Sequence, residues 1–412
     1  MAIQAEQFPH PESPMVAVTG SMAIGGASTF LVNLAAGFHG RGFKLSVVVM
    51  STRNDYRDEL ASYGARVVEI DRADSIYEDR IEKVYRAVAL HRPRMVLSTL
   101  SPESFEILRI APPGTLRAGM LQTDDPGVYG LVGTYRPWLD VVIGVSPTIC
   151  DRVRAMEEAG GLRVECIPYG IRFDHGVPER TPDSGAPLRV VYVGRLDEDQ
   201  KRISRIAAVI RRCAGRPMEF TVVGSGTHAE WFRGEVGGLP GVTLIGAVGG
   251  PEVQRILAGQ DVFLLLSDFE GLPLALLEAM GTGVVPVVSD LESGVRDLVG
   301  DRLGIRVPVG DIDAAVSALE RLAADPASLA AMGTACAAHA RSEFTAERMS
   351  ARYLALAGEA TGAEAPSWPW EFRLPVPLCL TPRWVYAEPA RTIRRMCRGI
   401  GLSGRRHRSV GE

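Results

Sequence analysis

Two glutamates that could take part in binding or catalysis, Glu270 and Glu278, lie eight positions apart in the stretch 267–290, SDFEGLPLALLEAMGTGVVPVVSD. Glu278 is the only charged residue in 272–282. It therefore lies either on the exposed side of a short helix or partly buried against a polar ligand. Burying a carboxylate without a partner is costly, and the two hydroxyls of a ribose are donors that would satisfy it. The local sequence leaves both interpretations open.

The segments around these glutamates predict a strand, a helix and a second strand. Residues 262–266 form an apolar run typical of a strand that is buried on both faces. Pro273 suits the first turn of a helix, which we expect to begin near Gly271. The glycines after Met280 are expected to end this helix, and 284–288 is expected to form the next strand.

The turn before this helix has the chemistry of an anion site. Backbone N–H groups and the positive end of the helix dipole lie there, so a diphosphate can be held without metal. Gly271 lets the backbone approach a ligand closely. Glu278 lies roughly 7–8 Å along the helix axis from Pro273, an offset comparable with the distance from a pyrophosphate to the ribose of the same nucleotide.

Two basic residues, Arg195 and Lys201, follow a predicted strand at 188–193. Arginine binds phosphate oxygens in a bidentate manner and lysine binds them as a point charge. The pair is therefore a candidate for binding an anionic ligand. The alternative is a surface ion-pair cluster with the acidic residues at 197–199.

The N-terminal half contains two further candidates. Gly25 and Gly26 precede a helix expected over 29–38, and they could present amides to a phosphate or sugar, or simply form a tight turn. The glycines of this turn do not form the G-x-G-x-x-G pattern of dinucleotide-binding folds. Asp124 follows an apolar stretch at 116–121 and could face a cleft, although Asp-Pro-Gly is also ordinary turn chemistry.

Strands and helices alternate over 15–168 and again over 188–357, which predicts two α/β domains with doubly wound parallel sheets. The stretch 169–187, with several Pro and Gly residues, is expected to be the linker. Residues 1–14 are expected to be a flexible N-terminus, and 358–412 a C-terminal extension with seven arginines near its end. This extension could bind an anionic membrane surface or be a solvated basic terminus.

Composition excludes several classes of protein. The net charge of −4 over 412 residues argues against nucleic-acid binding over the whole surface. Six cysteines without a C-x-x-C pair indicate neither a zinc site nor a disulfide framework. The start of the chain does not resemble a signal peptide, and no uncharged apolar run has the length of a membrane span. We expect a cytoplasmic protein that is soluble or peripheral to a membrane.

The chain resembles the retaining glycosyltransferases of family 4, which have the two-domain GT-B architecture with Rossmann-like domains facing a central cleft. The resemblance covers residues from about 15 to 357, and the motif from Glu270 to Met280 is the most specific. The matching motifs, in chain order, are Gly25-Gly26, Val145-Ser146, Ile167-Pro-Tyr-Gly-Ile171, Val193-Gly-Arg-Leu196 with Lys201, Val223-Gly-Ser-Gly226, and Glu270-Gly-Leu-Pro-Leu-Ala-Leu-Leu-Glu278 with Ala279-Met280.

The resemblance implies a role for each residue of the last motif. Glu270 would lie by the donor sugar and Glu278 would hold the ribose. Gly271, Leu272 and Pro273 would offer backbone groups to the sugar and phosphate. The family binds its sugar nucleotide mostly to the second domain, so these residues would form the donor site.

The resemblance also implies that Arg195 and Lys201 neutralise the diphosphate leaving group and substitute for a metal. They stand one residue further apart than in the common family pattern, so a bulged turn is expected to bring Lys201 to the phosphate. Asp124 is assigned to sugar contact, because 123–125 stands where many members have a histidine near the donor sugar. The remaining donor-binding assignments are glycines: Gly25, Gly26 and Gly224.

The expected function is metal-independent transfer of a hexose from a UDP- or GDP-sugar to an acceptor hydroxyl, with retention of the anomeric configuration and without a cofactor. The acceptor could be a glycan, a lipid or a small molecule. Two alternatives remain: a sugar-nucleotide 2-epimerase of the same fold, and a non-catalytic subunit that binds a sugar nucleotide.

Overall fold

The computed structural model of the 412-residue chain describes residues 14–71, 77–99, 101–173 and 185–360. The predictions for the N-terminus before residue 14, for the linker over 174–184 and for the C-terminal extension after residue 360 therefore lie outside the described residues.

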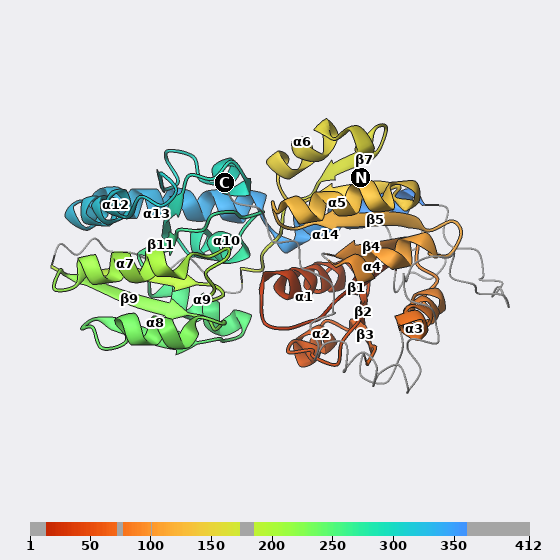
Figure 1. Cartoon of the computed structure of the whole chain (residues 1–412), viewed down its shortest axis with the longest axis horizontal. Coiled ribbons are helices and arrows are strands. Elements are labelled where there is room, and N and C mark those ends of the chain that lie inside the picture. The colour runs from red at the N-terminus through yellow and green to blue at the C-terminus, as the bar shows by residue number, and fades with distance from the viewer. Residues whose placement is uncertain (1–13, 72–76, 100, 174–184, 361–412) are drawn as a thin grey trace, which may run out of the picture.

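Two parallel β-sheets, one in each half of the chain, form the centres of two domains (Figure 1). The first sheet has the order β3-β2-β1-β4-β5-β6-β7 and the second β10-β9-β8-β11-β12-β13. The first comprises β1 Met15–Thr19, β2 Ser46–Val49, β3 Arg66–Glu69, β4 Met95–Thr99, β5 Leu116–Leu121, β6 Val141–Gly144 and β7 Arg163–Cys166. The second comprises β8 Leu188–Val193, β9 Met218–Val223, β10 Val242–Gly246, β11 Val262–Leu265, β12 Val285–Ser289 and β13 Ile305–Val307.

Helices cover both faces of each sheet, so central strands such as β1, β4, β11 and β12 are buried along their whole length. Two doubly wound domains are therefore confirmed. The helices are α1 Gly26–His39, α2 Arg57–Ser62, α3 Tyr77–Leu90, α4 Pro102–Phe105, α5 Pro126–Tyr135, α6 Pro147–Ala155, α7 Ile203–Cys213, α8 Ala229–Val236, α9 Gly250–Ala258, α10 Leu274–Gly281, α11 Gly294–Leu298, α12 Ile312–Ala324, α13 Pro326–Glu343 and α14 Ala346–Glu359.

Each sheet reverses its winding direction once, between β1 and β4 in the first domain and between β8 and β11 in the second. At such a point the chain leaves the carboxyl ends of two neighbouring strands in opposite directions, which opens a crevice. Ligands of open α/β sheets bind in this crevice. The loops after β8 and β11 are therefore placed side by side at one sheet edge.

The last described helix, α14, returns to the first domain and packs on α1 (Figure 1). The predicted second domain, 188–357, includes this helix. A Cβ atom at Gly37 of α1 would lie 2.5 Å from the Ala346 carbonyl oxygen, so the absence of a side chain at Gly37 permits the close approach. The second half of the chain thus provides part of the covering of the first sheet.

The described part of the linker is held by both domains. Ile171 donates its backbone N–H to the Phe344 carbonyl (2.8 Å) and accepts from the Ala346 N–H (3.0 Å). Arg172 pairs with Glu59 of α2 (2.6 Å), and its carbonyl accepts from Gln254 of α9 (2.9 Å). Residues 171 and 172 of the linker thus contact both domains.

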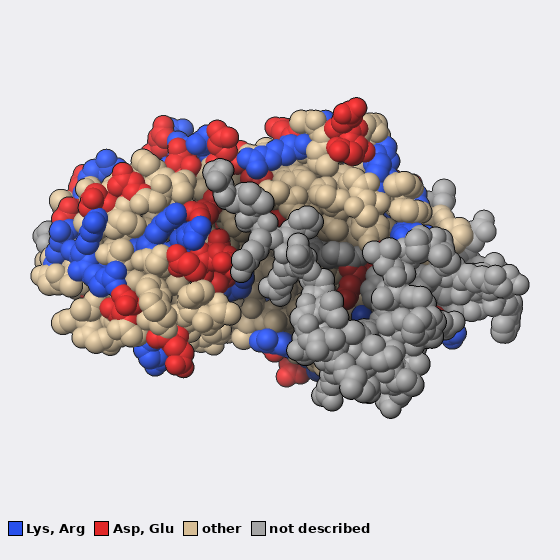
Figure 2. All heavy atoms as spheres, viewed as in Figure 1, with Lys and Arg blue, Asp and Glu red and all other residues tan. Residues whose placement is uncertain are grey.

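On the part of the surface that Figure 2 shows in colour, acidic and basic side chains are interspersed, and no large region of single sign is visible among these described residues. No helix within the described ranges is long and apolar enough to cross a membrane.

Candidate functional site

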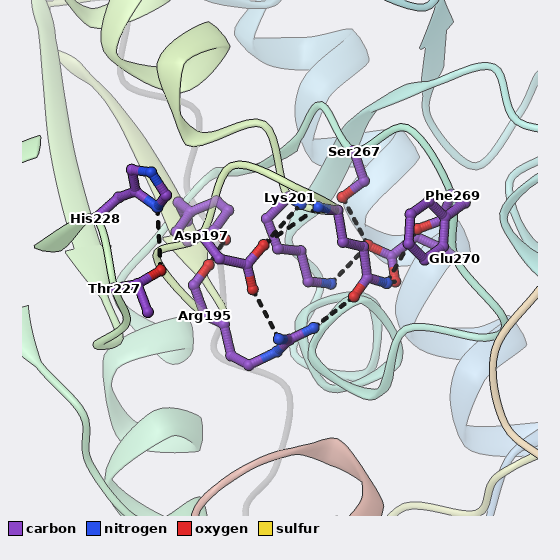
Figure 3. A network of polar contacts seen from close by, with 10 residues as sticks. Arg195, Asp197, Lys201, Thr227, His228, Ser267, Phe269 and Glu270 are labelled. Atoms are coloured by element: carbon purple, nitrogen blue, oxygen red, sulfur yellow. Dashed lines mark hydrogen bonds and ion pairs between the residues drawn. The ribbon is translucent and has the colours of Figure 1, made fainter. Parts of the chain in front are cut away.

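A polar network joins the loop after β8 to the loop after β11 at the carboxyl edge of the second sheet (Figure 3). Arg195 and Lys201 come from the first loop and Glu270 from the second. The structure therefore brings together three of the residues that the sequence nominates, although Glu270 is separated from the other two by about seventy positions of chain.

Glu270 is buried at the centre of this network, with 4% of its surface exposed. Its Oε1 atom lies 2.6 Å from Lys201 Nζ and accepts a hydrogen bond from Ser267 Oγ at 2.6 Å. Its Oε2 atom accepts from Gln200 Nε2 at 3.3 Å. The carboxylate is thus compensated by one charge and two neutral donors, as a buried anion requires.

Arg195 lies at the rim of the same network, with 62% of its side chain exposed. It pairs with Asp197 (2.8 Å) and donates to Gln200 Oε1 (2.5 Å). The predicted surface ion pair is therefore present at Arg195, whereas Lys201 is largely buried on Glu270. Gln200 contacts both Arg195 and Glu270 and so joins the rim to the interior.

The turn before Lys201 is held by Asp197, while the expectation that a bulged turn brings Lys201 to a phosphate stays a prediction. Asp197 Oδ1 accepts the backbone N–H groups of both Gln200 (3.3 Å) and Lys201 (3.2 Å), and Arg202 has a left-handed backbone with φ 47°. This turn directs the Lys201 side chain towards Glu270.

The helix α10 begins at Leu274, three residues later than predicted. Pro273 is its N-cap, and its carbonyl accepts from the N–H groups of Leu276 (3.1 Å) and Leu277 (3.2 Å). The prediction of a start near Gly271 was wrong because Pro273, with ψ 115°, is still extended. The helix ends at Gly281 and is followed by Gly283 with φ 78°, as the glycine signal predicted.

The first residues of α1 and α10, one helix from each domain, lie next to each other. A Cβ atom at Gly26 would lie 3.7 Å from Leu274 Cδ1, which is ordinary van der Waals contact. Gly25, the N-cap of α1, has φ 159°. The first N–H groups of a helix have no partner within it, so the boundary between the domains has two sets of donors.

Gly271 and Gly294 are sites of close approach between the domains. A Cβ atom at Gly271 would lie 2.2 Å from the Gln122 carbonyl oxygen in the first domain. One at Gly294 would lie 2.1 Å from the Gly271 carbonyl oxygen and 2.9 Å from Ser146 Cβ. The absence of a side chain at Gly271 is therefore required by domain packing, a reason that the sequence did not indicate. Leu272, the next residue, is buried.

Glu278 is buried in α10 with 7% of its surface exposed, so the exposed-helix interpretation is wrong. Within the described residues no hydrogen bond to its carboxylate is recorded. Burial raises its pKa from the usual 4.5 to about 7, the charge of Arg172 lowers it and that of Glu59 raises it further. A buried carboxylate without a hydrogen-bond donor is the state expected of a group that binds a polar ligand.

Asp124 is held by two side chains of its own domain. Its Oδ1 accepts from Tyr129 Oη (2.5 Å), and both its oxygens lie 2.6 Å from Arg152 Nη1. Arg152 also donates to the Glu292 carbonyl of the second domain at 2.9 Å. Burial raises the pKa of Asp124, while Tyr129 and Arg152 lower it. Asp124 therefore already has partners, and a sugar contact by this residue stays a prediction.

The glycines after β9 allow two loops of the second domain to pack together. A Cβ atom at Gly224, which has φ 147°, would lie 1.8 Å from the Gly194 carbonyl oxygen, and one at Gly226 would lie 2.4 Å from the Leu196 carbonyl oxygen. Gly224 thus supports the loop that carries Arg195.

Sequence reasoning missed three residues of this region. Gln200 is next to Lys201 and Ser267 is three positions from Glu270, so their proximity along the chain to these residues was an available signal. Arg172 directly follows the motif that ends at Ile171, but it is more than a hundred positions from Glu278, so no local signal linked these two residues. Within the described ranges, no group of three or more His, Cys, Asp or Glu side chains could hold a metal ion.

Comparisons with known proteins find similarity to glycosyltransferases. Residues 187–325 match the family model described as glycosyl transferases group 1. The chain is 34% identical over 169 residues to the amylovoran biosynthesis glycosyltransferase AmsK of Erwinia amylovora, covering 38% of this chain and 41% of that protein. It is 25% identical over 320 residues to phosphatidyl-myo-inositol mannosyltransferase of Mycolicibacterium smegmatis. This match covers 72% of this chain and 80% of that protein.

Two solved structures are similar over most of the chain. Sucrose-phosphate synthase from Thermosynechococcus elongatus has a TM-score of 0.69 at 17% identity and covers 83% of this chain and 98% of its own. Anabaena HepE, in complex with UDP and glucose, has a TM-score of 0.69 at 15% identity. This match covers 84% of this chain and 99% of the HepE chain. The protein has the GT-B fold, and the match to the glycosyl transferases group 1 model lies in its second domain.

Proposed function

We propose that the protein is a retaining glycosyltransferase of family 4 that moves a hexose from a nucleoside-diphosphate sugar to an acceptor hydroxyl without a metal. The observation that carries this proposal is Glu278, a buried carboxylate with no hydrogen-bond donor among the described residues. It lies in α10, the helix whose first residues lie next to those of α1. A ribose diol would supply its missing donors, and the helix N-termini would bind the diphosphate.

The remaining roles follow from charge and position. Glu270 would accept hydrogen bonds from the hydroxyls of the donor sugar. Lys201 and Arg195 would stabilise the negative charge that develops on the leaving diphosphate, which is preorganised electrostatic catalysis. In a front-face reaction the acceptor oxygen bonds to the anomeric carbon as the bond to the diphosphate breaks. The leaving phosphate oxygen takes the acceptor's proton, so no protein nucleophile is required.

A panel of sugar nucleotides tests the function. The full chain would be incubated with UDP-, GDP- and ADP-sugars while binding and nucleoside diphosphate release are followed, with and without acceptors. The acceptors should include lipids, because one relative is named as a mannosyltransferase of phosphatidyl-myo-inositol, and UDP is the first nucleotide to try, because HepE binds it. Acceptor-dependent release supports the proposal. Epimerised donor without acceptor, or binding without turnover, would instead support the epimerase or the non-catalytic subunit.

Donor affinity is expected to fall as the pH decreases below about 7. The free protein has Glu278 with a pKa of about 7, and a ribose that donates hydrogen bonds favours the ionised form, so donor binding should release a proton below this pH. The diphosphate of a sugar nucleotide remains ionised here. Calorimetric titration of the preferred donor at pH 6 and pH 8, in buffers of different ionisation enthalpy, measures both effects. Equal affinity and no proton release at pH 6 would contradict the assignment.

A further inference from the structure

Two cysteines of the first domain, Cys150 in α6 and Cys166 at the end of β7, have adjacent thiols. Cys166 is the register partner of Gly144 in β6, and a Cβ atom at Gly144 would lie 2.5 Å from Cys150 Sγ. Partner residues on adjacent parallel strands point to the same face, so Cys150 Sγ lies on the face to which Cys166 points. Cys150 Sγ donates to the carbonyl of Glu165, the residue before Cys166 in β7, at 3.5 Å.

The two thiols differ in exposure and in charge environment. Cys150 is fully buried, and the adjacent Cys166 sulfur, together with burial, raises its pKa. Cys166 is partly exposed. The adjacent Cys150 thiol lowers its pKa, as do the charges of Arg352 and Arg154, whereas burial and Asp297 raise it. Cys166 therefore has the environment of a nucleophilic thiol. Cys150 is a second, more buried thiol next to it.

Contacts to β7 hold both arginines near Cys166. Arg154 donates to the Val164 carbonyl at 3.2 Å, and Arg352 of α14 lies 3.7 Å from Glu165 Oε2. The charge environment of Cys166 is thus formed by the first domain together with the helix that returns to it.

The other two described cysteines lack this environment. Cys213 and Cys336 are buried, burial raises the pKa of both, to about 12 for Cys336, and no thiol contact is recorded for either within the described ranges. They are therefore internal controls for selectivity.

We propose that Cys150 and Cys166 are a modification site that forms a reversible disulfide when the protein meets a peroxide. The Cys166 thiolate attacks one oxygen of hydrogen peroxide, the O–O bond breaks, and Cys166 becomes a sulfenic acid as hydroxide leaves and is protonated to water. The Cys150 sulfur then attacks the Cys166 sulfur and displaces hydroxide, which takes the Cys150 proton. Two thiols are oxidised to one disulfide, and the peroxide is reduced to two molecules of water.

The disulfide would act on a helix that contacts the second domain. Thr148 of α6 donates to Asp297 Oδ2 through its hydroxyl (3.0 Å), and Arg152 donates to the Glu292 carbonyl (2.9 Å). Drawing α6 towards β7 is expected to change these contacts and so weaken donor binding; this consequence alone rests on the proposed function.

Peptide mapping of the full chain after graded hydrogen peroxide treatment tests the proposal without any activity assay. Blocking of free thiols, digestion with trypsin and mass spectrometry should show peptide 118–152 joined to peptide 164–172, with the loss of two hydrogen atoms and reversal by dithiothreitol. Cys213→Ala should leave this cross-link unchanged. Cys150→Ala should let Cys166 proceed to sulfinic acid, because no thiol resolves its sulfenic acid.

Two results would overturn the proposal: Cys166 that reaches sulfinic acid in the unaltered chain without a cross-link, or Cys166 that stays reduced while other thiols oxidise. Because the mapping uses the unaltered chain, neither result depends on a variant that folds poorly. A cross-link that forms without any change in donor affinity would support the disulfide and reject its proposed effect on donor binding.

Discussion

Replacing Lys201 by methionine is expected to destabilise the fold by roughly 3–5 kcal/mol and to slow sugar transfer by on the order of 100- to 1,000-fold. The loss of stability is expected because Glu270 would remain buried without its cation, from which it lies 2.6 Å. The loss of rate is expected because Lys201 would stabilise the leaving diphosphate. Chemical unfolding and initial transfer rates measure the two effects.

A second variant separates the two contributions. Combining Lys201→Met with Glu270→Gln removes both charges, so most of the stability should return while the rate stays low. Arg202→Met is the matched control from the same turn: its side chain is 39% exposed where it pairs with Asp268, so about 1 kcal/mol or less should be lost. Full activity in the folded Lys201→Met protein would reject the assigned role of Lys201.

Replacing Glu278 by glutamine is expected to weaken donor binding while it stabilises the protein at neutral and higher pH. Loss of a charged acceptor of hydrogen bonds should lower affinity on the order of 10- to 100-fold. Stability should rise because the folded protein holds this carboxyl at a pKa of about 7 instead of 4.5. Ionising it in the folded state therefore costs up to roughly 3 kcal/mol above pH 7.

The sign of this effect can be checked across pH. The pKa of Glu278 is raised in the folded state, so unaltered protein loses stability from this group as pH rises from about 4.5 to about 7. Glu278→Gln should lack this loss, and the two proteins should converge in acid. Glu252→Gln, on the exposed part of α9, is the control. Unchanged donor affinity in Glu278→Gln would reject the ribose assignment, whatever its stability.

Local signals account for what could be predicted of the site. The charged turn after β8 and the motif that contains Glu270 were recognisable because a strand, its turn and the following helix lie within a short stretch of chain. The same locality explains the error at α10: whether Pro273 is the first helical residue or its N-cap depends on one backbone torsion, and both are compatible with proline.

Contacts between distant segments decided the remainder. The burial of Glu278, the bond from Arg152 to Glu292 and the crowding at Gly271 all depend on how the two domains meet. No periodicity or turn signal in the sequence predicts how the two domains pack, because their interface joins residues far apart in the chain.

The sequence by itself thus determined two doubly wound domains and nominated Arg195, Lys201, Glu270 and Glu278. Alternating apolar runs specify buried parallel strands, and the turns after them place their residues at the carboxyl edge of a sheet. Only the tertiary structure decided that Lys201 is paired inside with Glu270, that Arg195 stays at the rim, and that Glu278 is buried without a hydrogen-bond donor among the described residues. The physical reason is that burial and pairing belong to the packed molecule, in which side chains from separate loops and domains share one desolvated space.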